Sequence, residues 1–468
     1  MNFRHLAGLL AALLMAGCST VRPWQNLPAR GDAPPIMSAT TQVDRNATAP
    51  SIIAAVTLSG GGARAAAFGL GVLQELKETG FEWEGRQTTL LDEVGLVSGV
   101  SGGSVLAAYY AAFGDETLTR FEPDFLLVDF QSGLIGRALS PDKLYDMTSS
   151  WFGRSNVLAE RLDGLYRGRT FGDLQARPRG PRLLVTATDL TSGAPFQFTL
   201  EQFALICSDL TSVPLSFAVA ASSSVPVLLT PMTLRNYAGN CPLQSAQAAD
   251  SRDDGNYRVR MLQDSAKSYL DAQERPFLHL VDGGLSDNLG VRALLDRSMA
   301  GGSIKESFRG VASGSVRKII LLAVNSERDT SERIDKDDHV PTTGQVMDSL
   351  LFGAGARATQ ETLAMLNDDA RRWNREIAQQ RGTPDSPFAA DAQIYVISVS
   401  LRDVPDSRLR QAVLQVPTAF TVTPVQVRQL KEAGRAALRE SPEFQRLRRG
   451  LSAAAQPSSA GPDVNAIR

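Results

Sequence analysis

The chain of 468 residues is poor in histidine and cysteine, with three of each. It also lacks an excess of either charge, since 48 Lys and Arg residues face 50 Asp and Glu residues. This balance gives no electrostatic reason to expect a nucleic-acid partner. No cluster of His, Cys and Asp has the spacing of a zinc site, so we expect no metal. With 43% hydrophobic residues, the composition is typical of a globular protein rather than a disordered chain.

The N-terminal apolar run, residues 6–15, is too short to cross a bilayer, for which a helix needs about 20 residues. It is typical of a signal peptide. The sequence that follows, Met15-Ala-Gly-Cys18-Ser19, resembles a bacterial lipobox, with Met15 where Leu is usual. We therefore expect a signal peptide over residues 1–17 and an acylated N-terminus at Cys18. The alternative is an ordinary signal peptide followed by a chance cysteine.

A lipidated Cys18 implies attachment to a membrane of the bacterial cell envelope, and Ser19 favours the periplasmic side of the outer membrane. Residues 19–50 are rich in Pro, Ala, Thr and Asn, so 18–50 is expected to be a lipidated N-terminus with a flexible tether. The remaining cysteines, Cys207 and Cys241, are an even pair in an oxidising compartment. This favours a disulfide, although two free thiols are the alternative.

Between residues 51 and 451, apolar segments typical of strands alternate with helical segments, which predicts an α/β fold with a mostly parallel sheet covered by helices on both faces. We expect a core over 51–325, a helical C-terminal extension with one further strand over 326–451, and a disordered tail over 452–468. Residues 236–276 are polar and predict a surface excursion. The segments 343–380 and 424–448 predict long helices, whose function the sequence leaves open. The predicted strands are Ile52–Leu58, Val94–Val97, Leu183–Ala187, Phe277–Val281, Lys318–Val324 and Gln393–Ser398.

A glycine-rich turn, Gly60-Gly61-Gly62-Ala-Arg64, follows the first predicted strand. Consecutive glycines let backbone N–H groups point into one small space, and at a helix N-terminus these donors suit an anion. That anion is a phosphate or the transient oxyanion of acyl transfer. The turn fits neither the Walker pattern nor the dinucleotide pattern, because Arg64 stands where the third glycine of the latter is needed.

A second turn, Gly99-Val-Ser101-Gly102-Gly103, follows the second strand and precedes a helix of small residues. A nucleophile elbow requires such a strand–turn–helix setting, in which glycines allow close backbone approach and the serine oxygen is exposed. Ser101 is therefore the candidate nucleophile, and the N–H of Gly102 is a candidate oxyanion donor. A structural Gly-Ser turn is the alternative.

The base for this serine is not an obvious histidine. His5 lies in the signal segment, His339 lies in a polar loop, and His279 lies within an apolar strand where a structural role is expected. The segment Asp282-Gly283-Gly284 ends the Phe277–Val281 strand and supplies a carboxylate instead. Burial would raise the pKa of that carboxyl towards the working pH of a general base. An ordinary Asp-Gly turn is the alternative.

These three sites in this order resemble the patatin-like phospholipases. That family shows Gly-Gly-Gly-x-Arg/Lys, then Gly-x-Ser-x-Gly, then Asp-Gly-Gly/Ala. The stretch Ala220–Pro226 is similar to the Ala-Ser-x-x-x-Pro segment that the family places between elbow and Asp, and Val416–Phe420 also resembles bacterial members. The segment Asp287-Asn288-Leu-Gly departs from the family pattern, which puts the local packing there in doubt.

The resemblance implies a patatin-like three-layer fold and a Ser-Asp dyad of Ser101 and Asp282, without a cofactor. It implies an oxyanion hole at Gly60, Gly61 and Gly62, beside Arg64, and hydrolysis of acyl esters in phospholipids or lysophospholipids. The alternatives are a general carboxylesterase or thioesterase, and a non-catalytic envelope lipoprotein that binds lipid or protein. No protein partner is indicated. The residues that would support the turns are Gly99, Gly103, Gly283 and Gly284.

Overall fold

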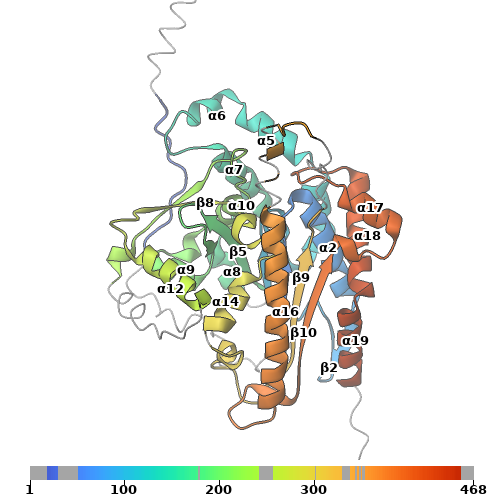
Figure 1. Ribbon diagram of the computed structural model, residues 1–468. Helices are drawn as coiled ribbons and strands as arrows, with labels where there is room; N and C mark the ends of the chain where they lie inside the picture. Colours follow the sequence, from blue (N-terminus) through green and yellow to red (C-terminus); the bar gives the residue numbers. More distant parts are fainter. Residues whose placement is uncertain are drawn as a thin grey trace, which may run out of the picture.

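The computed structural model describes residues 18–29, 51–177, 180–241, 257–300, 302–328, 338–342, 345, 346, 349 and 354–454. An eight-stranded sheet lies at the centre, in the order β10-β9-β1-β4-β5-β8-β7 with β6 paired to β5 (Figure 1). Its strands are β1 (Ile52–Leu58), β4 (Val94–Gly99), β5 (Arg182–Asp189), β6 (Pro195–Gln197), β7 (Met232–Arg235), β8 (Phe277–Val281), β9 (Val316–Asn325) and β10 (Phe388–Ser400). A separate hairpin joins β2 (Gly80–Trp83) and β3 (Arg86–Thr89).

Five neighbouring strands, from β10 through β9, β1 and β4 to β5, are parallel. Strand β8 runs antiparallel to β5, and β7 runs antiparallel to β8. The predicted α/β class with a mostly parallel sheet is confirmed, and all six predicted strands are present. The sequence did not indicate β6 and β7, because strands of three and four residues are too short to show a period of two.

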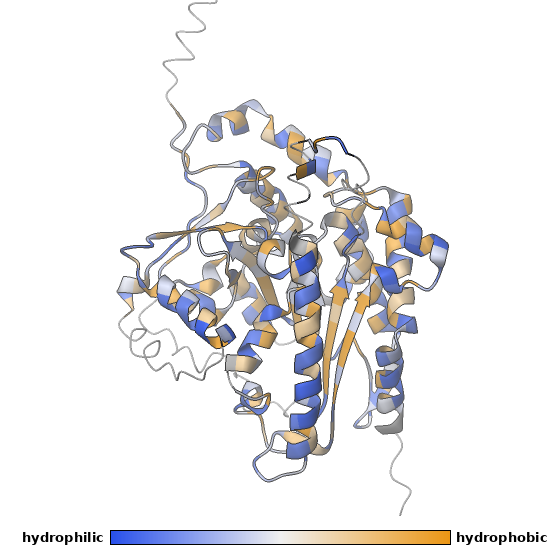
Figure 2. Ribbon diagram, viewed as in Figure 1, coloured by the Kyte–Doolittle hydropathy of each residue, from blue (hydrophilic) through white to orange (hydrophobic). Residues whose placement is uncertain are grey.

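The two faces of the sheet belong to two separate cores. Along β9, Ile320 and Leu322 face one core, whereas Ile319 and Leu321 face the other. This alternation follows from the period of two in a strand, and it requires apolar residues at consecutive positions of a doubly covered strand. Figure 2 shows β9 and β10 as largely hydrophobic strands beside α16, which carries many hydrophilic residues.

Helices cover both faces. One face is covered by α2 (Gly62–Glu78), α3 (Gly102–Phe113), α18 (Pro424–Glu440) and α19 (Pro442–Ala454), and the other by α14 (Arg292–Ala300) and α16 (Ala354–Gln380). The other α-helices of the described residues are α4 (Thr117–Phe121), α5 (Phe130–Ala138), α6 (Pro141–Asp146), α7 (Arg154–Tyr166), α8 (Phe171–Gln175), α9 (Leu200–Leu205), α10 (Leu215–Ser222), α12 (Tyr257–Leu270), α13 (Gly284–Asp287) and α17 (Ser407–Leu414).

Several sequence-based boundaries differ from the structure. The predicted excursion over 236–276 contains the helix α12, while residues 242–256 lie outside the described residues. The predicted helix over 424–448 is two helices, because Pro442 cannot continue α18 and begins α19 instead. Helix α19 extends to Ala454, past the expected start of the tail, and residues 455–468 are outside the described part.

The N-terminal segment 18–29 packs against the core, which corrects the expectation of a flexible tether over this part of 18–50. The Asn26 side chain is buried and donates to the Ser208 Oγ at 2.9 Å. The Trp24 ring lies 4.7 Å from that of Phe217. The packed ring and the bonded amide are contacts that oppose the conformational entropy lost when this segment is ordered. Residues 1–17 and 30–50 are outside the described part. Among the helices that are described, none has the length and apolar character needed to cross a membrane.

Candidate active site

Ser101 lies on a tight turn between β4, which ends at Gly99, and α3, which begins at Gly102. Its backbone has φ 48° and ψ −123°, a conformation that is rare for a residue with a side chain. The turn needs its glycines, since a Cβ at Gly99 would lie 2.5 Å from the Cα of Ser104, and one at Gly103 would lie 2.4 Å from the Leu58 carbonyl oxygen. This is the strained strand-to-helix geometry of a nucleophile elbow.

The strained turn is held by a buried serine that the sequence analysis did not single out. The Ser101 N–H donates to the Oγ of Ser222 at 2.8 Å, and that hydroxyl donates to the Thr186 carbonyl at 2.6 Å. On the other side of the turn, the Ser104 Oγ donates to the Ser101 carbonyl at 2.6 Å. Ser222 lies within the Ala220–Pro226 stretch noted in the sequence, and its role follows only from these contacts.

Asp282 directly follows β8, a strand antiparallel to β5, and lies beside the turn that carries Ser101. In the parallel part of the sheet, β4 ends where Gly99 pairs with Val185 of β5. Strand β5 continues beyond that point, and β8 runs back along its extension, with Val281 paired to Thr188. The carboxyl end of β8 is thereby brought back towards the elbow. The sequence places Asp282 at the end of this strand but does not indicate that the strand is antiparallel to β5.

One short segment, residues 222–224, positions both candidate catalytic residues. The Asp282 N–H donates to the Ser224 carbonyl at 3.0 Å, and the Gly283 N–H donates to the Ser222 carbonyl at 3.1 Å. Because Ser222 also receives the Ser101 N–H, residues 222–224 connect the elbow to the end of β8. The structure therefore brings Ser101 and Asp282 together through backbone contacts.

The Asp282 carboxylate has one satisfied oxygen and one unsatisfied oxygen. Oδ1 accepts the Gly284 N–H at 2.8 Å, whereas Oδ2 is buried without a hydrogen-bond partner among the described residues. Burial raises the pKa of Asp282 to about 6, and hydrogen bonding from Gly284 and the nearby Ser101 side chain acts in the opposite direction. The Ser101 hydroxyl is thus near enough to influence the carboxyl without forming a well-aligned hydrogen bond to it. The two residues are only 9% and 8% exposed.

Neither described histidine occupies the position of a base. His279 is exposed on β8, where its Nδ1 lies 3.0 Å from the Thr233 Oγ1 on the neighbouring strand. The His339 side chain is 86% exposed, beside Asp338. In the part of the chain that is described, no group of three or more His, Cys, Asp or Glu side chains could hold a metal ion.

The glycine-rich turn lies against the elbow, and its amides differ in availability. The Gly60 N–H donates to the Asn288 carbonyl at 3.0 Å, so it is not free to bind an oxyanion, contrary to our expectation for Gly60. The N–H groups of Gly61, Gly62 and Gly102 have no acceptor among the described residues. A Cβ at Gly102 would lie 2.4 Å from the Gly62 nitrogen, so the N-termini of α2 and α3 converge. Two helix N-termini and three amide donors favour negative charge at this point.

Arg64 supports the turn rather than facing the serine. Its Nε donates to the Ser326 carbonyl at 2.9 Å, and one terminal nitrogen donates to the Val416 carbonyl at 2.8 Å. Burial lowers the pKa of Arg64 to about 9, with a further decrease from Arg328 and an opposing increase from Glu327. The segment that Arg64 holds also contains Ala419, whose carbonyl accepts the Ala63 N–H at 2.7 Å. This assigns the Val416–Phe420 stretch a structural role beside the site.

The segment after Asp282, which departs from the family pattern, packs directly on the site. The Asn288 Oδ1 would lie 2.5 Å from a Cβ at Gly60 and 3.1 Å from one at Gly284, so a side chain at either position would require Asn288 to shift. The Asp287 carboxylate accepts the N–H groups of Gly290 and Arg292 at 3.1 and 2.9 Å. This arrangement explains how the departing sequence still closes the turn.

The cysteines are divided as the sequence suggested. Cys207 and Cys241 form a disulfide with a Cα–Cα distance of 5.9 Å, and Cys18 is a free, exposed cysteine. Cys207 also accepts the Ala29 N–H at 2.8 Å through its carbonyl. The disulfide therefore lies where the N-terminal segment meets the core.

The fold and the site together define an α/β protein in which a serine on a strained turn lies beside a buried carboxylate and free backbone amides. The model of the family described as patatin-like phospholipase matches residues 56–295, about half of the chain. The chain therefore belongs to the patatin-like phospholipase family.

Solved structures give distant likenesses. Human GIVD cytosolic phospholipase A2 is 13% identical with a TM-score of 0.43, and the match covers 90% of this chain and 65% of that chain. VipD from Legionella pneumophila is 14% identical with a TM-score of 0.32, covering 95% and 73%. The type III effector protein ExoU is 17% identical with a TM-score of 0.24, covering 87% and 77%. The chain thus spans less than two thirds of the human phospholipase. No curated protein matches the sequence.

Proposed function

We propose that the chain is a serine lipid acyl hydrolase that cleaves an acyl ester of a phospholipid or lysophospholipid. Membership of the patatin-like phospholipase family supports the reaction class. The single observation that carries the proposal is the unsatisfied, buried Oδ2 of Asp282 beside a serine held on a strained turn. A buried acceptor without a partner is costly, and such groups are concentrated at functional sites.

In the proposed mechanism, Asp282 Oδ2 takes the hydroxyl proton as the Ser101 oxygen attacks the ester carbonyl. The Gly284 N–H keeps Oδ1 occupied, so the carboxylate is oriented with Oδ2 as the accepting atom. A pKa of about 6 lies near the working pH of a general base, which favours proton transfer. Protonated Asp282 then returns the proton to the departing alcohol, and water cleaves the acyl-enzyme by the reverse sequence.

The developing oxyanion is bound by backbone amides. The free N–H groups of Gly61, Gly62 and Gly102 lie at the convergence of two helix N-termini. Removing one oxyanion donor in related acyl-transfer chemistry costs about 3–4 kcal/mol of transition-state stabilisation. These donors are already oriented by α2 and α3, so little reorganisation is needed during the reaction.

We further propose that the mature protein is attached to a membrane of the bacterial cell envelope through acylated Cys18, on the periplasmic side of the outer membrane. The lipobox-like sequence and the exposure of Cys18 support this assignment. Mass spectrometry of the purified protein tests it directly. A mature N-terminus at Cys18 with added acyl mass is expected, and an unmodified N-terminus elsewhere would reject the anchor without affecting the hydrolase proposal.

A fluorophosphonate probe tests the enzyme. Labelling of wild type at Ser101 and its loss in Ser101→Ala are expected, with an unchanged thermal unfolding midpoint as the control for folding. Turnover of phospholipid and lysophospholipid compared with short p-nitrophenyl esters then separates a lipid hydrolase from a general esterase. Hydrolysis retained by pure Ser101→Ala protein would falsify the assignment of the nucleophile, and absence of labelling in wild type would favour a non-catalytic lipoprotein.

A further inference from the structure

Helix α5 has two apolar stripes, of which only one packs on the core. Phe130 and Leu134, four residues apart, are buried, whereas Ile135 is 51% exposed and Leu139, which directly follows the helix four residues further on, is 64% exposed. Residues at this spacing share one side of a helix, so the second stripe points away from the core. A second apolar stripe is not needed to hold α5 in place.

Further exposed apolar side chains lie on neighbouring segments. They are contributed by α6, by the segment before α7 and by the loop after Pro226, which Arg154 ties to the start of α7 by donating to the Val227 carbonyl at 2.8 Å. Figure 1 shows α5 and α6 together at one end of the molecule, at the end towards which β9 and β10 point. We call this surface the apolar face, and its members are Ile135, Leu139, Leu144, Tyr145, Trp151 and Leu228.

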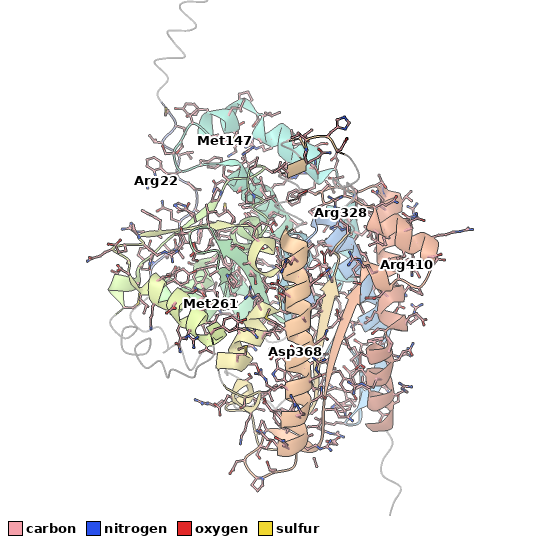
Figure 3. The ribbon with its side chains drawn as sticks, in the orientation of Figure 1. Arg22, Met147, Met261, Arg328, Asp368 and Arg410 are labelled. Atoms are coloured by element: carbon pink, nitrogen blue, oxygen red, sulfur yellow. A yellow bond between two sulfur atoms is a disulfide. The ribbon has the colours of Figure 1, made fainter. Side chains whose placement is uncertain are left out.

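The candidate lipid anchor lies at the edge of the apolar face. The Ser19 N–H donates to the Thr148 Oγ1 at 2.8 Å, and the Arg22 guanidinium lies 3.8 Å from the centre of the Trp151 ring. Cys18 is therefore adjacent to α6. Aromatic residues with one polar edge, together with arginine, are enriched where proteins meet the polar layer of a membrane. Figure 3 shows Met147 at this end of the molecule and Arg22 just below it.

The apolar face is also connected to the candidate active site. Leu228 follows Ser224 by four residues, and residues 222–224 contact both Ser101 and the backbone of Asp282. The site itself lies at the carboxyl end of β4, which is the end of the sheet where α5 and α6 lie. A membrane against this face would thus lie at the same end of the molecule as the site, and clustered exposed apolar side chains mark sites of membrane or protein interaction.

We propose that the apolar face docks on the surface of a phospholipid bilayer and that acylated Cys18 anchors the protein at its edge, so that the active site faces the lipid. This inference rests on the proposed lipid substrate and lipid anchor. The anchor alone would restrain only the N-terminus, and the apolar face determines which side of the protein meets the membrane.

Quenching of tryptophan fluorescence by brominated lipid chains tests the orientation. Trp151 is the exposed tryptophan of the apolar face, whereas Trp83 and Trp373 are buried and Trp24 is half-buried. With the purified full chain on phosphatidylcholine vesicles that carry bromine on their acyl chains, part of the emission should be quenched. The Trp151→Phe variant should lose that quenched part.

Charge placed on the apolar face should weaken docking. The double variant Leu139→Asp, Leu228→Asp is expected to lower the equilibrium constant for docking on the vesicle by at least about tenfold, since two apolar side chains no longer enter the lipid. Met261→Asp is the matched control, because Met261 is 61% exposed on α12, away from this end of the molecule (Figure 3). Hydrolysis of a water-soluble ester should be unchanged in both variants.

The outcomes separate the proposals from one another. Vesicle-bound protein with an unquenched Trp151 overturns the apolar face as a lipid surface and favours a protein partner there. Unchanged quenching in the double variant also overturns it. If the double variant unfolds, Leu139→Asp alone, at the exposed residue that follows α5, gives the same comparison. Quenching does not depend on turnover. If the wild type proves catalytically inactive, the proposed hydrolase function is rejected, and the quenching measurement still decides whether the apolar face docks on lipid.

Discussion

Replacing Asp282 by Asn is expected to abolish turnover and, at neutral pH, to relieve a cost that the ionised carboxylate imposes on the fold. Burial raises the pKa of Asp282 from 3.8 to about 6. The folded protein therefore holds this proton more tightly than the unfolded chain does. The stabilisation from this group is complete below the unfolded pKa and is lost as the pH rises through the folded pKa.

The size of this effect follows from the shift. A displacement of about two units corresponds to about 3 kcal/mol, at 1.36 kcal/mol per unit. The free energy of unfolding of Asp282→Asn, measured relative to wild type, should therefore rise by about 3 kcal/mol between about pH 4 and about pH 8. A constant penalty of about 1–3 kcal/mol is superimposed, because the new amide group lies where Oδ2 had no partner.

Urea unfolding of both proteins across this pH range measures the difference. Asp287→Asn is the matched control, since the pKa of Asp287 is also raised to about 6 by burial. Both of its carboxylate oxygens, however, accept backbone N–H groups. Asp287→Asn should lose one of these hydrogen bonds and be less stable than wild type at low pH. At the same pH, Asp282→Asn should lose no hydrogen bond and show only the cost of burying its new amide group. A pH-independent difference between Asp282→Asn and wild type would refute the reasoning.

The remaining predictions concern activity and the turns. The kcat/KM of wild type should rise with pH through about 6, as Asp282 loses its proton, and a profile that is flat there would contradict its role as base. Ser222→Ala should slow fluorophosphonate labelling of Ser101 by about tenfold or more, since about 1–3 kcal/mol is lost for each buried partner left unsatisfied. Ser224→Ala, which removes an equally buried hydroxyl that does not bond to the elbow, should label at the normal rate. Gly62→Ala should destabilise far more than Gly85→Ala in thermal unfolding, because both have positive φ but only the first Cβ meets a backbone carbonyl, at 2.2 Å.

The sequence was informative where a feature is local. Buried parallel strands are short apolar runs, so Ile52–Leu58 and its parallel neighbours could be found from the sequence pattern alone. The elbow could be found for the same reason, because close backbone approach restricts Gly99 and Gly103 to glycine. Such constraints act on the residue that carries them and are therefore visible in one sequence.

Features set by long-range pairing were not accessible in this way. The direction of β8 depends on the extension of β5 beyond β4, which leaves no local pattern in Phe277–Val281. The Gly60 N–H was expected to be free, and its acceptor is the carbonyl of Asn288, far away in the sequence. Residues 18–29 were expected to be flexible because their composition resembles a linker, whereas their contacts involve single side chains such as Asn26.

The geometry of the candidate dyad does not depend on a hydrogen bond between its two side chains. Ser101 is held through its backbone N–H by Ser222, and Asp282 is held through its backbone N–H by the carbonyl of Ser224. The two residues are therefore positioned through their backbones, while Asp282 Oδ2 has no hydrogen-bond partner among the described residues. In a serine–histidine–carboxylate triad, an imidazole must be oriented by a further residue. A buried carboxylate oriented by Gly284 requires no such residue, so the proposed dyad would need no histidine.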